Sequence, residues 1–132
     1  MLHHISLGVS SIERACAFYD VVLAELGYRR VWTDLRPGER HQAVGYGIED
    51  GKDLLALKER EASPLVAGKG FHLALRSPSR SAVDAFHAAA MRMGATDQGA
   101  PRLWSEFGAN YYAAYVLDPD GWQLEAVCNL PE

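Results

Sequence analysis

Two histidines and one glutamate in this chain have the types and positions expected of a divalent metal site. His4 and His72 lie at equivalent places in two similar stretches, and Glu125 lies near the end of the chain. Two neutral imidazoles and one carboxylate that leave coordination positions open suit Fe, and Mn, Zn, Ni or Co could bind the same set. A single histidine on a strand is more often a hydrogen-bonded core residue. The combination leads us to predict a metal site at His4, His72 and Glu125.

Strands are the elements that must position these ligands, because the residues around them alternate in polarity. In residues 3–9 the apolar side chains share one face, which leaves His4 on the other face. Glu125 would likewise face away from its apolar neighbours Leu124 and Ala126. A twofold relation between the two halves of the chain would aim both histidines into a shared cleft.

The two halves repeat one order of elements. Each opens with a strand, at residues 3–9 and 71–75, and continues with an apolar helical stripe that ends at Gly27 or Gly94. Helix starts are predicted at the capping-box pattern Ser10-Ser11-Ile12-Glu13 and at Ser77-Pro78, where a cap residue precedes a proline. Further strands are expected at residues 28–33, 42–48, 54–58, 111–117 and 123–127.

The repeat also holds in register. His4 precedes Phe18 by 14 positions, and His72 precedes Phe86 by the same 14. A half of this size could not easily bury its own sheet face. We therefore predict a single α+β domain over residues 1–132, built from two βαβββ modules at 1–61 and 70–132 with a linker at 62–69. The two modules would form a curled mixed sheet around an open cleft.

Composition excludes several classes of partner. The 132 residues carry a formal charge of −4 and are 48% hydrophobic, which argues against nucleic acid or an anionic membrane as the main partner. No apolar run approaches the roughly 20 residues of a membrane-spanning helix. The two cysteines, Cys16 and Cys128, do not form a CxxC pair and read as buried apolar residues, so we expect a cytoplasmic protein.

Aromatic residues gather near the expected mouth of the cleft. The cluster consists of Trp104, Phe107, Tyr111, Tyr112 and Tyr115. Trp104, Phe107 and Tyr112, with Tyr46 from the first half, are candidates for a pocket that holds an apolar or aromatic ligand. The alternative is that they form ordinary sheet core. His41, near a turn, could also reach the cleft from its loop.

Several of these motifs resemble the vicinal oxygen chelate superfamily, which includes glyoxalase I, extradiol dioxygenases, fosfomycin-resistance proteins and bleomycin-binding proteins. The resemblance rests on the βαβββ repeat, on the opening His-Ile-Ser-Leu-Gly-Val with Ala-Phe-Tyr, and on the closing Asp-Pro-Asp-Gly-Trp-Gln-Leu-Glu. It covers nearly the whole chain. In the metal-dependent members the ligands come from the first and last strands of the modules, a pattern that His4, His72 and Glu125 match.

The resemblance also implies differences among reactions. Glyoxalase I has a further carboxylate on the last strand of the first module, where the sequence match here places Leu55, and leucine can neither bind a metal nor transfer a proton. The remaining ligand set is that of the extradiol dioxygenases, and Tyr115 matches a tyrosine that those enzymes place near the substrate. The second-shell histidines of those enzymes have no counterpart here, which leaves Tyr115 and Glu106 as candidates for proton handling.

Together these features predict a metal-dependent enzyme, a homodimer, that acts on a small substrate chelated through two neighbouring oxygens. Its reaction would be of the lyase or isomerase type or an extradiol-type ring cleavage. The alternative is a metal-free protein of the same fold that binds or sequesters a small molecule, as bleomycin-resistance proteins do.

Overall fold

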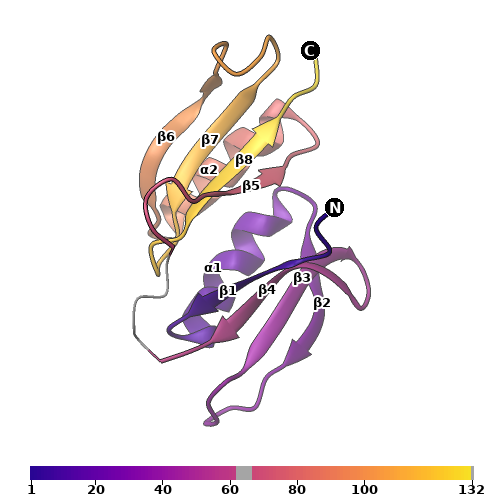
Figure 1. The fold of residues 1–132 in the computed structure, drawn as a ribbon, viewed down its shortest axis with the longest axis vertical. Helices are drawn as coiled ribbons and strands as arrows, with labels where there is room; N and C mark the ends of the chain where they lie inside the picture. The colour runs from indigo at the N-terminus through magenta and orange to yellow at the C-terminus, as the bar shows by residue number, and fades with distance from the viewer. Residues whose placement is uncertain (62–66, 132) are drawn as a thin grey trace.

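The computed structural model describes residues 1–61 and 67–131, so most of the predicted linker, residues 62–66, lies outside the described residues. Figure 1 shows two modules, each with one helix and a four-stranded sheet. In chain order the elements are β1 (Ile5–Val9), α1 (Ile12–Ala24), β2 (Arg29–Asp34), β3 (Ala43–Glu49), β4 (Lys52–Glu59), β5 (Leu73–Arg76), α2 (Arg80–Arg92), β6 (Thr96–Leu103), β7 (Tyr112–Leu117) and β8 (Gln123–Cys128).

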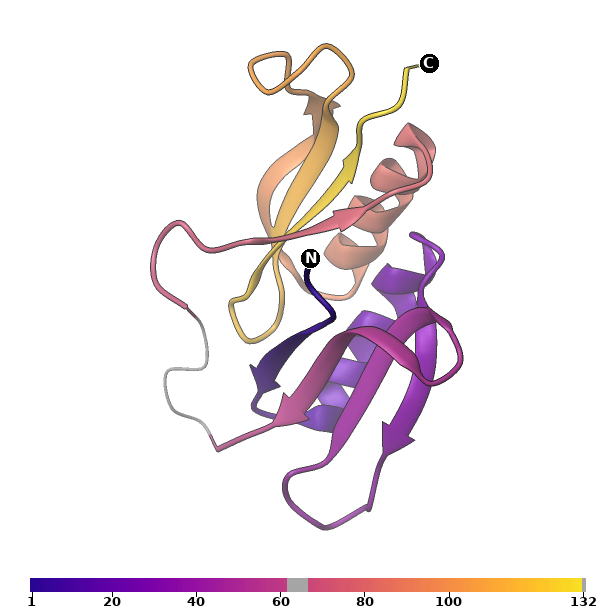
Figure 2. The same cartoon turned by 45° about the vertical axis from the view of Figure 1, so that its right-hand side comes forward.

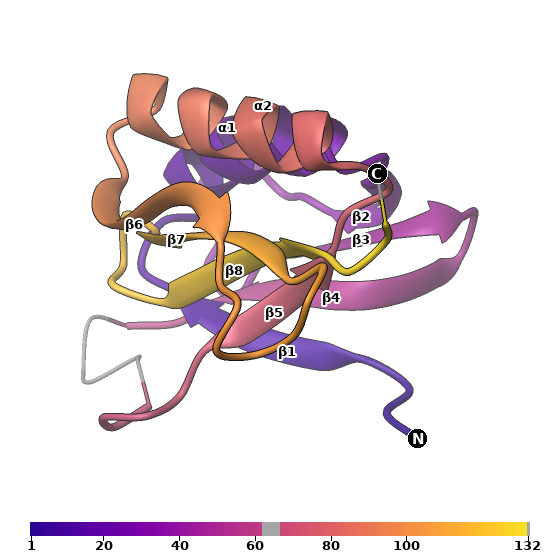
Figure 3. The ribbon, with the colours of Figure 1, turned by 90° about the horizontal axis from the view of Figure 1, so that it is seen from above.

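The two sheets have the same topology. Their strand orders are β1-β4-β3-β2 and β5-β8-β7-β6, and in each the first strand pairs with the last in parallel while the other pairs are antiparallel. Figure 2 shows each sheet with its own helix, and in Figure 3 both helices lie on the same side of the sheets. The predicted α+β fold of two βαβββ modules is confirmed, and the sheets are not closed into a barrel.

The hydrophobic core lies between the helices and the sheets and includes residues of both modules. Among its largest fully buried side chains are Phe18 and Tyr19 from α1 and Phe86 from α2. Each such side chain contributes about 1.5–3 kcal/mol by its removal from water. The opposite face of each sheet, which we call the open face, carries no helix. No helix among the described residues has the length and apolar composition needed to cross a membrane.

The helix starts differ in detail from the sequence prediction. Ser11, rather than Ser10, caps α1 by accepting a hydrogen bond from the backbone N–H of Arg14. Ser79, rather than Ser77, caps α2 and accepts from the N–H of Ala82. Both caps satisfy backbone donors that the first turn of a helix leaves without partners.

Strand β6 is missing from the sequence prediction. It contains Gly99 and Pro101, two residue types that are depleted in strands. Proline is tolerated there because β6 is the edge strand of its sheet, and the pairing with β7 shifts register on both sides of Gly99.

The turn between β7 and β8 holds the two modules together. Asp118 is buried and accepts hydrogen bonds from the Tyr19 hydroxyl at 2.6 Å and from the backbone N–H of Asp120 and Trp122. The indole N–H of Trp122 donates to the carbonyl of Gly8 at 2.8 Å. Since Tyr19 and Gly8 belong to the first module, this turn links the second sheet to α1 and β1.

A second set of bonds from the same turn reaches the start of α1. Asp120 accepts from the Ser10 hydroxyl at 2.6 Å and from the Arg14 guanidinium at 3.1 Å. This explains why Ser10 does not cap the helix, since its side chain is used between the modules. The turn ends at the strand that carries Glu125, so the contact fixes that strand relative to module one.

Candidate functional site

Glu125 is the centre of a cluster on the open face of the second sheet. Its neighbours on β8, Leu124 and Ala126, are fully buried in the core on the helix side. Strand alternation therefore directs Glu125 to the open face, where Tyr115 of β7 and Ala74 of β5 lie opposite it. His72, two residues before Ala74, extends along the same face.

The carboxylate of Glu125 is held differently at its two oxygens. The Tyr111 hydroxyl donates to Oε1 at 2.5 Å. Nε2 of His72 lies 3.0 Å from Oε2, within ion-pair distance. The direction of the contact does not meet hydrogen-bond geometry, so Oε2 has no hydrogen-bond partner among the described residues although Glu125 is 0% exposed.

The distance between His72 and Glu125 fits two ligands of one metal ion. Donor atoms that bind an ion at about 2.1 Å and at right angles lie about 3.0 Å apart. A buried carboxylate oxygen normally has a hydrogen-bond partner, and its lack of one needs an explanation. An imidazole nitrogen and a carboxylate oxygen side by side are donors that Fe, Mn, Zn, Ni and Co accept. The residues present therefore fit a divalent metal.

Aromatic side chains form a continuous ring of contacts around His72 and Glu125. His72 packs edge-on against Tyr115, and Tyr115 against Trp104, with ring centres 6.2 and 5.2 Å apart. Trp104 stacks on Phe107, which in turn meets the ring of Tyr111 edge-on at 5.5 Å. We use the name Glu125 cluster for the six residues in this ring of contacts: Glu125, His72, Tyr115, Trp104, Phe107 and Tyr111. It offers a flat apolar wall beside two polar donors.

Two tyrosines of the Glu125 cluster are kept protonated by their surroundings. Burial, with the hydrogen bond to Glu125 and its charge, raises the pKa of Tyr111 to about 12. Burial and the charge of Glu125 also raise the pKa of Tyr115 well above its usual value. Both hydroxyls therefore stay neutral near pH 7 and can donate hydrogen bonds.

An ion pair between Arg102 and Glu106 lies at the rim of the Glu125 cluster. The Arg102 guanidinium lies 3.3 Å from the centre of a Trp104 ring and 3.3 Å from the carboxylate of Glu106. Glu106 is exposed, and its own backbone N–H, with Arg102, holds its pKa below the usual range. Glu106 is thus an ionised rim residue, and the structure does not place it in the Glu125 cluster.

His4 does not join the cluster within one chain. Its ring is exposed, lies 2.9 Å from that of His3 (Nδ1 to Nδ1), and borders a cavity between the N-terminal residues and β5. Within residues 1–61 and 67–131, no three His, Cys, Asp or Glu side chains are arranged to hold a metal ion. Of the three predicted ligands, the single chain brings His72 and Glu125 together and leaves His4 apart from them.

Two predicted pocket residues face the helices instead. The hydroxyl of Tyr46 donates to Asp20 of α1 at 2.7 Å, and that of Tyr112 donates to Asp84 of α2 at 2.7 Å. Their strands alternate so that these rings point away from the open face. The prediction that they line a pocket with Trp104 and Phe107 is wrong for this structure. Tyr111, predicted only as a member of the aromatic cluster at the cleft mouth, holds the position beside Glu125.

Strand register corrects the match between modules at the last strand. Ile5 lies opposite Leu55, and Leu73, its equivalent in module two, lies opposite Leu124. Leu55 therefore corresponds to the core residue Leu124, and Ala56 is the counterpart of Glu125. Alanine has no ligating group, so module one still lacks a carboxylate at this position.

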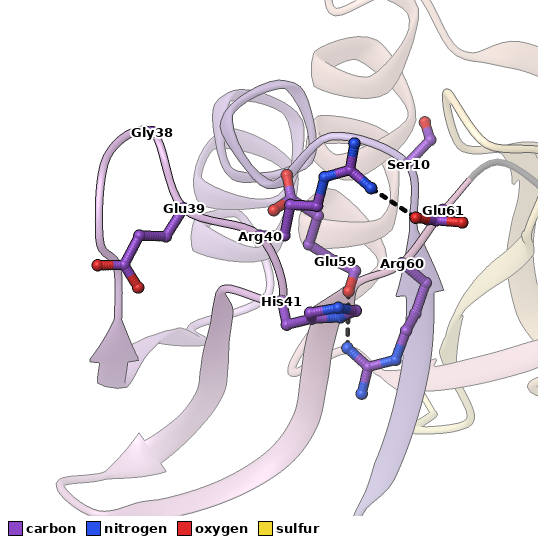
Figure 4. Close-up of a pocket in the computed structure, with 8 residues that line it drawn as sticks. All are labelled: Ser10, Gly38, Glu39, Arg40, His41, Glu59, Arg60 and Glu61. Carbon is purple, nitrogen blue, oxygen red and sulfur yellow. Dashed lines mark hydrogen bonds and ion pairs between the residues drawn. The ribbon is translucent and has the colours of Figure 1, made fainter.

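A separate cavity of about 620 Å³ lies in module one, between the loop after β2 and the end of β4. Figure 4 shows His41 pointing into it beside Arg60, with Arg40 directed at Glu61. The side chains of Arg40 and Glu61 form an ion pair in which both partners are exposed to solvent. The Arg60 guanidinium donates a hydrogen bond to the backbone carbonyl of Glu59. His41 therefore lines a different hollow from the Glu125 cluster.

Comparison with known proteins agrees with this architecture. A glyoxalase/bleomycin resistance protein from Albidiferax ferrireducens T118 is 27% identical, with a TM-score of 0.76 over 96% of this chain and 98% of that chain. A glyoxalase I variant from Zea mays is 22% identical, with a TM-score of 0.75 over 97% of this chain and 46% of that one. The fosfomycin resistance protein FosX from Listeria monocytogenes is 15% identical, with a TM-score of 0.69 over 98% and 90%.

The last two similarities, below 25% identity, show the fold alone. No curated protein sequence matches the chain. The family model described as Glyoxalase/Bleomycin resistance protein/Dioxygenase superfamily matches residues 1–126, nearly the full length. The chain therefore belongs to the glyoxalase/bleomycin resistance protein/dioxygenase superfamily.

Proposed function

We propose that the chain is a metal-dependent enzyme in which His72 and Glu125 hold a divalent ion and a small substrate binds through two neighbouring oxygens. The observation that carries this proposal is the buried, unpartnered Oε2 of Glu125 beside Nε2 of His72. A buried polar atom without a hydrogen-bond partner lowers the stability of the fold, and such unfavourable arrangements occur mainly at functional sites. When bound, such an ion supplies Lewis acidity to substrate oxygens.

The other residues of the Glu125 cluster have roles that follow from their positions. Tyr115 faces Glu125 from β7 and stays protonated near pH 7, so its hydroxyl can donate to a substrate oxygen. Trp104 and Phe107 form the apolar wall against which a flat substrate can be oriented. Glu106 lies at the rim, where its carboxylate can exchange protons with solvent. Its ion pair is with Arg102 and not with a residue of the Glu125 cluster.

Substrate chelation by neighbouring oxygens is compatible with this fold. The FosX structure was solved with Mn(II) and a dihydroxypropylphosphonic acid, a ligand rich in oxygens. The reaction proposed here is of the lyase, isomerase or ring-cleaving dioxygenase class. The glyoxalase I proton transfer is not proposed, because Ala56 stands where module one would need a carboxylate.

We place the third ligand, His4, on a second copy of the chain. His4 and His72 directly precede equivalent strands in the two modules, and the alternation of those strands, continued by one residue, directs both to the open face. In a twofold homodimer the open face of module one from one copy would meet that of module two from the other. His4 would then approach His72 and Glu125 across the interface, which gives the three protein ligands usual in catalytic metal sites.

Hybrid dimers test the shared site. A chain with His4→Ala is refolded together with a chain with Glu125→Ala, and mixed dimers are isolated through two different tags. If the ligands come from two chains, each hybrid regains one intact site and binds one Mn(II) per dimer. If they come from one chain, neither site is intact and the hybrid binds none.

A metal-dependent reaction is tested separately with compounds that carry two neighbouring oxygens, such as catechols, α-hydroxy ketones and vicinal diols. Turnover that needs added metal and disappears in His72→Ala supports the enzyme. The aromatic wall itself favours a second candidate, a metal-free binding protein. Binding of such compounds with the same affinity in wild type, in His72→Ala and in chelator would establish that candidate instead.

A further inference from the structure

Tyr111 and Glu125 form the shortest contact of the Glu125 cluster, and it occupies only one carboxylate oxygen. The tyrosine hydroxyl lies 2.5 Å from Oε1, while Oε2 faces His72 without a hydrogen-bond partner among the described residues. We infer that Tyr111 is a positioning residue that restricts Glu125 to one ligating oxygen and thereby sets the metal preference of the site. This inference rests on the proposed function.

The backbone around Tyr111 keeps its hydroxyl in place. Its N–H donates to the carbonyl of Gly108 at 3.2 Å, and its own carbonyl accepts from the N–H of Trp104 at 2.7 Å. The ring also packs edge-on against Phe107. These contacts close the loop between β6 and β7 into a compact unit, so the hydroxyl is a fixed donor and not a mobile surface group.

A fixed donor on Oε1 has a chemical consequence for the carboxylate. A short hydrogen bond to Oε1 makes that oxygen a weaker metal donor, so a cation binds preferably through Oε2, the oxygen without a hydrogen bond. Ca²⁺ takes six to eight oxygens and often binds carboxylates through both, whereas Mn²⁺ and its neighbours are satisfied by fewer ligands that include imidazole nitrogen. Tyr111 therefore favours a first-row transition ion over Ca²⁺.

The chain provides a matched control in the next residue. Tyr112 has the same hydroxyl and lies one position further along, but its side chain points to the opposite face and donates to Asp84 of α2. Tyr112→Phe removes an equivalent tyrosine hydrogen bond without touching Glu125. A change seen in Tyr111→Phe and absent from Tyr112→Phe is thus specific to the carboxylate.

The experiment measures binding of Mn²⁺ and Ca²⁺ to the full chain by isothermal titration, and the visible absorption spectrum of the Co²⁺-loaded protein. Wild type, Tyr111→Phe, Tyr111→Leu and Tyr112→Phe are compared, and far-UV circular dichroism identifies which variants are folded. Removal of an outer-shell partner typically weakens metal binding about 10- to 100-fold. We expect a loss of about 10-fold or more for Mn²⁺ in Tyr111→Phe, a smaller loss or a gain for Ca²⁺, and an altered Co²⁺ spectrum.

The outcomes separate this inference from the proposed function. If wild type binds Mn²⁺ and both Tyr111 variants keep the wild-type ratio of Mn²⁺ to Ca²⁺ affinity, the inference is wrong and the proposed metal site stands. If wild type binds neither ion, the proposed function and the inference fall together. A ratio shifted towards Ca²⁺ in a folded Tyr111 variant, with Tyr112→Phe unchanged, establishes the role of Tyr111, and a shift towards Mn²⁺ overturns it.

Discussion

Nε2 of His72 lies 3.0 Å from Oε2 of Glu125, an oxygen that is fully buried and lacks a hydrogen-bond partner in the described part of the chain. A carboxylate in this state lowers the stability of a protein, because its desolvation is only partly offset by the Tyr111 hydroxyl. The arrangement is understandable if a ligand that binds between the two side chains completes their coordination. Several consequences can be measured without knowledge of the substrate.

The first concerns the charge of Glu125. Glu125→Gln removes the buried charge and keeps a side-chain oxygen for the Tyr111 hydroxyl. In a chelating buffer we expect its free energy of unfolding to be about 1 kcal/mol higher than that of wild type. Mn²⁺ at about 100 times its dissociation constant should then stabilise wild type by about 2.7 kcal/mol and leave the variant unchanged. Urea denaturation with and without metal measures both effects, and a variant less stable than wild type in chelator would contradict the account.

The contact between modules makes a second prediction. Asp118→Ala leaves the buried Tyr19 hydroxyl and two backbone N–H groups without their acceptor. We expect the free energy of unfolding to fall by about 2–4 kcal/mol. Asp50→Ala, which removes an exposed partner of Arg29, is the control and should change it by less than about 0.5 kcal/mol. Equal effects of the two substitutions would show that Asp118 does not hold the modules together.

The third prediction is a loss of stability at high pH. Burial, together with the carboxylates of Asp118 and Asp20, raises the pKa of Tyr19 and Tyr46 above the ordinary value of about 10. Each folded-state pKa exceeds the unfolded one, so the stability that each tyrosine contributes is complete below about pH 10 and is lost as the pH rises towards the folded pKa.

Comparison of wild type with Tyr46→Phe isolates one of these groups. Between about pH 10 and pH 11, the difference in their free energies of unfolding should shrink by about 1 kcal/mol, because the unfolded Tyr46 hydroxyl of wild type ionises over this range while the folded one stays protonated. Urea denaturation at each pH, with tyrosinate absorbance recorded in parallel, checks this. A difference that stays constant over this range would mean that Tyr46 has no raised pKa in the folded protein.

The repeat in the sequence predicted the two-module architecture but not the position of every strand. The two halves of the chain match in the positions of His4 and His72 and of the glycines that end the helices. This match indicated two βαβββ modules, and the structure has them. Strand β6 could not be predicted, because Gly99 and Pro101 remove the usual alternation and are tolerated only through the edge position of the strand.

The site was predictable only in part, for reasons of strand register and topology. Alternation around Leu124 correctly directs Glu125 to the open face, and His72 lies beside it. The same reasoning failed for Tyr46 and Tyr112, because the sequence does not tell which face of β3 and β7 meets a helix. His4 shows a different limit: equivalence within a repeat does not bring two residues together in one chain.

Metal content of the purified protein tests the central claim most directly. Wild type, His72→Ala and Glu125→Gln are produced without chelator, dialysed against Mn²⁺ and then against metal-free buffer, and analysed by mass spectrometry of the elements. His87→Ala is the control, since that histidine pairs with Asp97 outside the Glu125 cluster. We predict close to one ion per chain in wild type and in His87→Ala, and little or none in the other two variants. Equal metal content in wild type and His72→Ala would contradict a site built on His72 and Glu125.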